Sequence, residues 1–299
     1  MEDLPYHGSG PYCYSSCLVM MMGSGAPAPG VVETVTGSPF GAQLLGGTLP
    51  FFDPYGWTPE TGVDDALTAL GWAARTTGGG DADAALDRLA SHLADGPVVA
   101  GPVEMGHLRH QPGRSGPVGA DHYVVVLDAD EDGVTLHDPE GHPYARLPIA
   151  DFVAAWRAED VEYGDPFTLR SNFTRISRVL PEEAIESIVP RAVSWLGPEN
   201  GDAVLALADR VADGCDPALR EHLAGFAIRV GARRLADAAA CLRHVGRDTA
   251  AGTLTRQARL LGSLQYPVAT GDDRAAARIL RALAPTYGTL REDLGRRCG

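Results

Sequence analysis

The spacing of apolar residues changes near residue 180, so the two parts of the chain predict different structures. Before this point, helical periodicity alternates with β-branched runs, which indicates an α+β domain over residues 1–180. After it, Ala, Leu and Arg recur at helical spacing, which predicts an all-helical domain over residues 181–299. Breaks between its helices are expected at Gly197-Pro198, Gly214, Gly246 and Pro267.

Two strand-like runs in the first part are joined by an acidic segment. Residues 122–127 and 133–137 flank a turn with three aspartates, so they predict an antiparallel hairpin. A calcium loop would need a later bidentate glutamate, which the spacing lacks, so we interpret the segment as a hairpin tip. The other elements expected in this part are helices over 13–22, 62–70 and 81–94 and strands over 97–103 and 168–179.

Charge and composition narrow the possible chemistry. The chain has 299 residues and a formal charge of −14, which argues against nonspecific binding of nucleic acid. Residues 1–180 carry nine arginines against 24 acidic residues, whereas residues 181–299 are nearly balanced. The chain contains no lysine, so Schiff-base catalysis and lysine-dependent phosphate loops are excluded.

Cysteine usage and hydropathy suggest a compartment. Five cysteines without regular spacing are typical of reduced thiols rather than of a disulfide framework. No second ligand pair supports a zinc site, and no carboxylate partner is indicated for His107 and His110, so we expect neither a metal nor a cofactor. No secretory signal or membrane-spanning run is evident, so we expect a cytoplasmic protein without a membrane partner.

Three residues that can build a thiol nucleophile follow one another along the first part. Cys13 begins a predicted helix, where backbone N–H groups and the macrodipole favour a thiolate. His122 opens one strand of the predicted hairpin and Asp138 closes the other, so pairing can bring them together. Alone, Cys13 could be core packing (as we interpret Cys17), His122 a strand histidine and Asp138 a turn former. Together they predict a Cys-His-Asp site.

The segments around these residues resemble a known group of enzymes. Cys13–Leu18 resembles the nucleophile segment of the papain-like cysteine peptidases that process bacteriocin leaders. Asp121–Val126 and Asp138-Pro139 resemble the histidine strand and the aspartate end of the same group. With Pro102–Leu108 and the helical C-terminal region, these segments are more similar to the butirosin biosynthesis protein H-like family. The resemblance implies a papain-like cysteine-peptidase fold with an antiparallel sheet for residues 1–180.

The same resemblance implies an activity. Members of that family transfer acyl groups from carrier-protein thioesters to amines, so we expect an acyltransferase of specialised metabolism, such as antibiotic biosynthesis. Its donor would be an acyl carrier protein, bearing the acyl group on phosphopantetheine, or another thioester, and its acceptor a small-molecule amine. A cysteine peptidase or amidase with the same triad and a non-catalytic papain-like binding module remain alternatives, because the triad does not select the acceptor.

Further residues complete the expected site. The leader-processing peptidases carry a glutamine six residues before the nucleophile as an oxyanion donor. His7 holds that position here, and its imidazole N–H is the candidate replacement, with the backbone N–H of Cys13 as the alternative. The Gly- and Pro-rich segment Gly106–Gly119 predicts either a mobile lid or a solvated loop. The lid or substrate-binding candidates are Glu104, His107, Arg109 and Tyr123.

Arginines of the second part have two interpretations. A basic stripe along a helix would suit an acidic carrier protein, whereas such arginines commonly form a solvated helix face. The arginines concerned are Arg229, Arg233, Arg234, Arg243 and Arg247.

Overall fold

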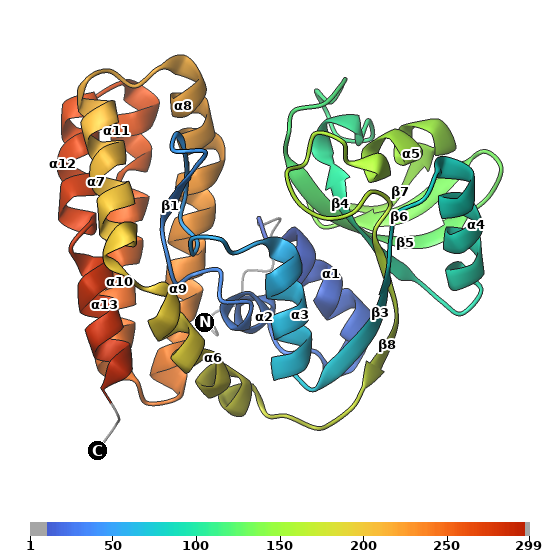
Figure 1. Ribbon diagram of the computed structural model, residues 1–299, viewed down its shortest axis with the longest axis horizontal. Helices are drawn as coiled ribbons and strands as arrows, with labels where there is room; N and C mark the ends of the chain where they lie inside the picture. The colour runs from blue at the N-terminus through green and yellow to red at the C-terminus, as the bar shows by residue number, and fades with distance from the viewer. Residues whose placement is uncertain (1–10, 297–299) are drawn as a thin grey trace, which may run out of the picture. The chain divides into compact units, whose positions relative to one another are not determined.

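The computed structural model describes residues 11–296 and divides the chain into two compact units (Figure 1). Unit 1 comprises Met1–Pro29 and Gly71–Arg178, and unit 2 comprises Gly30–Leu70 and Val179–Gly299. The chain thus returns to unit 2 close to the predicted boundary at residue 180. Residues 30–70, however, belong to unit 2 and not to the first domain as predicted, because they pack against the C-terminal helices.

Unit 1 is built on a six-stranded sheet with the order β3-β8-β4-β5-β6-β7, in which every neighbouring pair is antiparallel. The predicted antiparallel sheet and the α+β class are therefore confirmed. Its strands are β3 (Trp72–Thr77), β4 (Val98–Glu104), β5 (Asp121–Ala129), β6 (Gly133–Asp138), β7 (His142–Pro148) and β8 (Leu169–Arg175). Its α-helices are α1 (Cys13–Met22), α4 (Ala82–Leu93) and α5 (Ile149–Arg157), and its 3₁₀ turns are η1 (Gly23–Gly25) and η2 (Met105–His107).

Helices cover both faces of this sheet. Val124 and Val126 of β5 join a buried apolar core together with residues of α4 and α5. Tyr123 instead meets Tyr14 of α1, with ring centroids 5.9 Å apart and nearly perpendicular planes. Because successive strand residues point to opposite faces, α1 lies on the face opposite α4 and α5.

The capping residues explain where several helices begin. Asp81 accepts a hydrogen bond from the N–H of Ala84 at the start of α4, as expected for an N-cap aspartate. In unit 2, α3 (Pro59–Ala69) follows the cap Thr58. Proline stands at the first helical position of α3 and also of α6 (Pro181–Trp195), α7 (Pro198–Ala212) and α8 (Pro217–His222). The N-cap residues and the prolines therefore mark the starts of these helices.

Unit 2 is a helical assembly that also contains a small hairpin. The prediction of an all-helical domain is confirmed for its described residues, 181–296, although Pro267 lies inside α11 rather than at a break. A single π-helical turn, η3 (Leu223–Ala227), joins α8 to α9. The helices are α2 (Pro29–Val35), α3 (Pro59–Ala69), α6 (Pro181–Trp195), α7 (Pro198–Ala212), α8 (Pro217–His222), α9 (Ile228–His244), α10 (Asp248–Ser263), α11 (Gln265–Thr270), α12 (Asp273–Leu283) and α13 (Thr286–Gly295), and the strands are β1 (Gln43–Leu45) and β2 (Leu49–Phe51).

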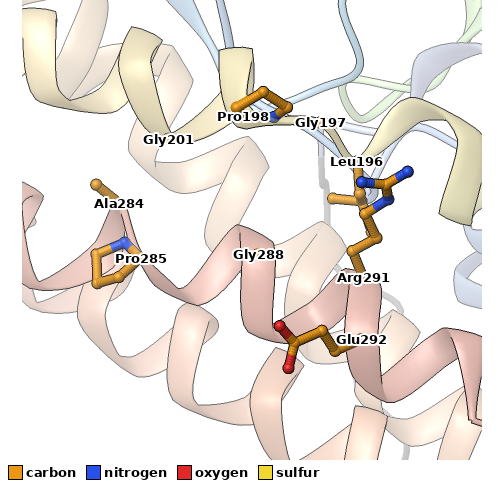
Figure 2. A pocket seen from close by; sticks show the side chains of 9 residues that line it. All are labelled: Leu196, Gly197, Pro198, Gly201, Ala284, Pro285, Gly288, Arg291 and Glu292. Carbon is orange, nitrogen blue, oxygen red and sulfur yellow. The ribbon is translucent and has the colours of Figure 1, made fainter.

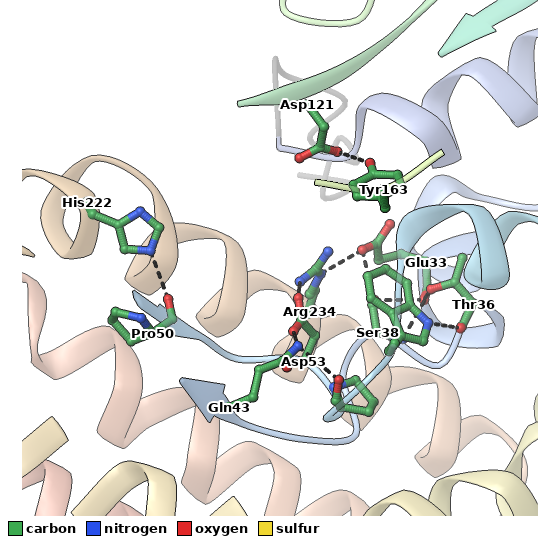
Figure 3. Close-up of polar contacts among 12 residues, drawn as sticks. Glu33, Thr36, Ser38, Gln43, Pro50, Asp53, Asp121, Tyr163, His222 and Arg234 are labelled. Carbon is green, nitrogen blue, oxygen red and sulfur yellow. Dashed lines mark hydrogen bonds and ion pairs between the residues drawn. The ribbon is translucent and has the colours of Figure 1, made fainter. Parts of the chain in front are cut away.

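A buried ion cluster fastens the segment 30–70 to α9 (Figure 3). Arg234 donates from Nε to Glu33 Oε1 at 2.8 Å and from Nη1 to Asp53 Oδ2 at 3.2 Å. Gln43 donates to the other oxygen of Asp53 at 2.7 Å. These side chains are buried, and the guanidinium of Arg234 also lies over the ring of Trp57. The ion pairs and hydrogen bonds of this cluster, together with the contact of Arg234 with Trp57, therefore hold this segment in unit 2.

Candidate functional site

His122 and Asp138, which lie on different strands, are brought together by the hairpin. The β5–β6 register pairs Val125 with His137 and Val126 with Leu136, so the start of β5 lies beside the end of β6. The Nε2 atom of His122 lies 2.8 Å from Oδ1 of Asp138, and both side chains are buried. This part of the predicted triad is assembled in the structure.

Asp138 has more hydrogen-bond partners than the one, His122, that the sequence predicts. Oδ1 accepts from the backbone N–H of Glu140 at 2.8 Å as well as meeting His122. Oδ2 lies 2.7 Å from His110 Nε2 and accepts from Gln111 Nε2 at 2.7 Å. Burial alone would raise the pKa of Asp138, but the bonds to His110 and His122, the attraction of His122 and the bond from Gln111 hold the pKa of this carboxyl well below its usual range. Asp138 is therefore an anion at neutral pH.

The charge of Asp138 determines which nitrogen of His122 carries a proton. A carboxylate only accepts hydrogen bonds, so Nε2 of His122 must be the N–H that donates to it. In the neutral ring, Nδ1 is then the basic nitrogen. His122 is thus arranged to exchange a proton through Nδ1 while Asp138 holds the opposite side of the ring.

Cys13 begins α1, as the sequence predicts, and its side chain is half-buried. Helix α1 packs against β4 and β5, and the ring contact of Tyr14 with Tyr123 joins the residues that follow Cys13 and His122 in the chain. One turn further along α1, burial raises the pKa of the Cys17 thiol well above its usual value, and the charge of Asp138 adds to this. The neighbours of Cys13 therefore place the first turn of α1 close to the His122–Asp138 pair.

The environments of the described thiols differ. Cys17 is fully buried, in keeping with its interpretation as a packing residue. Burial also raises the pKa of Cys215, and it raises the pKa of Cys241 despite a hydrogen bond from Thr34. A thiol that is harder to ionise is a poorer nucleophile near neutral pH. Among these, only Cys13 combines a helix N-terminus with partial exposure.

Glu104 fastens the two ends of the segment 106–119. Its buried carboxylate accepts from the backbone N–H groups of Gly106 and Val118 at 2.9 Å and of Gly119 at 3.0 Å. Both ends of the segment are thus fastened to the end of β4, and most of residues 112–119 are exposed. The segment is therefore a loop with anchored ends and an exposed tip.

The other candidate residues occupy different settings. Tyr123 is fully buried, and its ring lies so close to Gly101 that a Cβ there would clash. Arg109 is exposed and pairs with Asp151 at 3.5 Å. His107 is half-buried at the end of η2. His7, the oxyanion candidate, lies outside the described residues.

Sequence reasoning missed the polar partners of the site. His110 and Gln111 lie in the irregular loop, where no periodicity signals a side chain's direction, and His110 meets a carboxylate that the sequence did not indicate. Tyr163 donates to Oδ2 of Asp121 at 2.6 Å, beside His122 in the chain (Figure 3). Burial and the charge of Asp121 raise the pKa of Tyr163 well above its usual value, so its hydroxyl stays protonated.

Comparison with known proteins gives two matches. Residues 197–295 match the YobF C-terminal domain family. A protein described as "Uncharacterized protein YobF", from Bacillus subtilis (strain 168), is 32% identical over 163 residues, which is 54% of this chain and 52% of that protein. The chain thus spans about half the length of this curated relative. The family match runs from α7 to α13 in unit 2, so Cys13, His122 and Asp138 lie outside it.

Within unit 2, the five arginines do not form one exposed basic stripe. Arg234 is buried against Glu33 and Asp53, which contradicts the prediction of a solvated or docking face at this position. Arg233 pairs with Asp237 at 3.0 Å. Arg247 pairs with Glu186 and also donates to the backbone carbonyl of Leu294, and Arg243 donates to Thr255. Acidic partners therefore already compensate most of this positive charge.

A hollow of about 380 Å³ lies between the start of α7 and α13 (Figure 2). Pro198 and Gly201 line one side, and Ala284 and Pro285 line the other. Its charged side chains, Arg291 and Glu292, neighbour each other on α13. Among the described residues, no nucleophile or histidine lines the hollow, so we assign it no chemistry.

Over residues 11–296, no group of three or more His, Cys, Asp or Glu side chains is placed to hold a metal ion. None of the helices described there is both long and apolar enough to cross a membrane.

Proposed function

We propose that this protein is a thiol-dependent acyltransferase in which Cys13 carries the acyl group as a thioester. The observation that carries the proposal is the buried His122–Asp138 pair, whose histidine lies on β5, one of the two strands against which the helix of Cys13 packs. A paired imidazole can hold a nearby thiol as thiolate, and a helix N-terminus favours the same anion. The proposal includes a papain-like fold for unit 1, a cytoplasmic localisation and a role in specialised metabolism.

The first half of the reaction loads the enzyme. The Cys13 thiolate attacks the carbonyl carbon of an acyl thioester, and the new C–S bond replaces the C–S bond to the donor. The departing donor thiolate takes the proton from Nδ1 of the His122 imidazolium, which leaves the ring neutral. Backbone N–H groups of the first turn of α1, with His7 as a side-chain candidate, would donate to the oxyanion.

The second half transfers the acyl group. An amine attacks the Cys13 thioester, gives its proton to Nδ1 of His122, and releases Cys13 as thiolate while the amide forms. The enzyme returns to its starting ion pair, and Asp138 remains an anion throughout because its role is to orient and stabilise the imidazolium. No cofactor is required by these steps.

The resemblance to the butirosin biosynthesis protein H-like family supports the choice of donor and acceptor. An acyl carrier protein or another thioester would supply the acyl group, and a small-molecule amine would receive it. Water in place of the amine would make the same site a peptidase or amidase, and an unreactive Cys13 would make unit 1 a binding module. The acyl-enzyme step separates these possibilities.

The test is a loading experiment followed by intact-mass measurement. The full chain is incubated with an acyl pantetheine thioester, and we expect one acyl adduct that maps to Cys13. The adduct should disappear on addition of a primary amine, with the matching amide as product. C13A should form no adduct, whereas C215A, which removes a thiol outside the site, should load like the wild type.

The other outcomes each have a clear meaning. Discharge to free acid regardless of added amine, together with cleavage of peptides, would replace the transferase with a hydrolase. Absence of any adduct, with Cys13 alkylated by iodoacetamide no faster than Cys215 at pH 7, would refute catalysis and leave the binding module.

A further inference from the structure

The carboxylate of Asp138 is held by more groups than an orienting aspartate needs. Oδ1 serves His122 and the N–H of Glu140, and Oδ2 serves His110 and Gln111. A carboxylate has about four lone-pair positions for hydrogen bonds, so these four contacts fill them. Rotation of the carboxylate, which would exchange the two oxygens, would break all four contacts at once.

The buried position in which His110 contacts Asp138 leaves another polar atom of its ring without a hydrogen bond to any described residue. Its side chain is 8% exposed, and its second nitrogen, Nδ1, is buried without a hydrogen-bond partner among residues 11–296. An unsatisfied buried polar atom lowers stability, so such atoms call for an explanation. The remaining described ring contact of His110, with His142 at 5.6 Å between centroids, would be served equally by an apolar ring. The contact with Asp138 is the feature that requires a histidine.

The loop that carries His110 and Gln111 is built to present them. Glu104 holds both ends of the segment 106–119, and Leu108 is fully buried in the core of unit 1. Gln111 is itself oriented, because its Oε1 accepts from Nε of Arg114 at 3.2 Å. This leaves the Nε2 amide of Gln111 directed to Asp138.

We propose that His110 and Gln111 are positioning residues that hold Oδ2 of Asp138, so that Oδ1 stays committed to His122 and Nδ1 of His122 stays directed at the reacting sulfur. This inference rests on the proposed function, since it gives the loop a task in forming the Cys13–His122 ion pair. The two residues act through Asp138 and need not touch the substrate.

Four variants test the proposal. H110F keeps a ring of similar shape but removes the donor, and Q111L removes the other donor to Oδ2. H110Q restores an N–H group at position 110. H142F is the matched control, because it keeps an aromatic ring against His110, and the side chain of His142 supplies none of the four contacts with the Asp138 carboxylate.

The first readout is the pH dependence of Cys13 alkylation by iodoacetamide, followed by mass spectrometry. If Asp138 loses its fixed orientation, the imidazolium is less stabilised and the thiolate forms only at higher pH. We expect the midpoint to rise by about one pH unit in H110F and Q111L, which lowers the rate about tenfold at pH values below both midpoints. H110Q should recover part of this loss, and H142F should match the wild type.

The second readout is the imidazole N–H of His122, observed by NMR in C13A and in C13A combined with each variant. A proton held between Nε2 and Asp138 gives a low-field, slowly exchanging signal in C13A. We expect H110F to broaden or lose this signal, while H142F keeps it. A purely structural role would lower thermal stability without changing either readout in the protein that remains folded.

The outcomes separate this inference from the proposed function. If wild-type Cys13 is alkylated no faster than Cys215, the proposed function fails, and this inference fails with it. If Cys13 is fast but its midpoint is unmoved or lowered in H110F and Q111L, only the positioning role is refuted. Should H110F fail to fold, Q111L carries the same prediction and decides it.

Discussion

Two buried carboxylate clusters of this protein contrast in the partners that surround them. In unit 1, Asp138 is held by His110, His122 and Gln111. In unit 2, Glu33 and Asp53 share the guanidinium of Arg234. Both clusters satisfy buried anions, as burial demands, but they do so with side chains of different chemistry.

The difference lies in whether a proton can move. An imidazole gains and loses a proton near neutral pH, so the Asp138 cluster can take part in proton transfer. A guanidinium stays charged at every ordinary pH and offers a fixed set of donors, so the Arg234 cluster can only hold its partners in place. Burial and short hydrogen bonds therefore do not distinguish the two clusters; the chemistry of the partner side chains does.

The largest effect that this contrast predicts is on reactivity in unit 1. D138N keeps the size of the side chain but removes the charge that stabilises the His122 imidazolium, and its amide group can favour the wrong ring tautomer. We expect the rate of acyl loading on Cys13 to fall by about 10³–10⁴-fold, in line with the loss of an orienting aspartate in a catalytic triad. Single-turnover loading, measured by intact mass, gives this rate directly.

R234M serves as the control for this measurement, because it disrupts the other buried cluster. The folded fraction of R234M should load Cys13 at a rate close to that of the wild type. A D138N protein that loads normally would show that Asp138 is a structural anion like Glu33, and the contrast between the clusters would disappear.

The next largest effect is on the stability of unit 2. R234M leaves Glu33 and Asp53 buried without their shared cation, so we expect the free energy of unfolding to fall by about 3–5 kcal/mol. Hydrogen exchange followed by mass spectrometry during urea unfolding reports the two units separately. The loss should appear in the peptides of 30–70 and of α9.

R233M is the matched substitution on the next residue of the same helix. Arg233 is partly exposed, and its described acidic partner, Asp237, lies one helical turn away, so its loss should cost about 0.3–0.5 kcal/mol. Equal effects of R233M and R234M would mean that burial of the Arg234 cluster does not set its strength.

The elements of the fold were predicted well where the sequence pattern is strong and poorly where it is weak. Helix α1 begins and ends at the predicted residues, and the β5–β6 hairpin follows from its apolar runs. Strands β3 and β7 were missed because they lie at the sheet edges, where half-exposed residues dilute the alternation. Helix α5 follows β7 directly, without a polar N-cap to signal its start.

The spacing of residue types along the chain could not predict packing between segments that are far apart in the sequence. The transfer of residues 30–70 to unit 2 depends on contacts such as that between Glu33 and Arg234, which are 201 residues apart. The same limit applied to the site: the ends of a hairpin can be paired from sequence, so His122 and Asp138 were found. His110 and Gln111 contact Asp138 from an irregular loop, where no helical or strand periodicity predicts the direction of a side chain.

An effect smaller than that of R234M concerns acid stability and follows from the low pKa of Asp138. Burial opposes ionisation of this carboxyl, but its bonds to His110, His122 and Gln111 outweigh burial and lower the pKa in the folded state. The unfolded chain therefore binds this proton more readily than the folded one. The stabilisation is fully present above the ordinary aspartate pKa of about 3.9, and it is lost as pH falls through the folded-state pKa.

We therefore expect the wild type to exceed D138N in unfolding free energy by about 2 kcal/mol at pH 5–6, and this difference to shrink steadily below pH 4. Urea unfolding of unit 1 at several pH values, followed by hydrogen exchange, measures the difference. D130N is the control, because Asp130 also has a lowered pKa, from its bond to Arg146, but lies exposed on a hairpin turn where solvent screens it. The cost of R234M in unit 2 should persist from pH 5 to 8, since the guanidinium does not titrate there. A wild-type advantage over D138N that stayed constant down to pH 2.5 would show that Asp138 contributes through packing rather than through its charge.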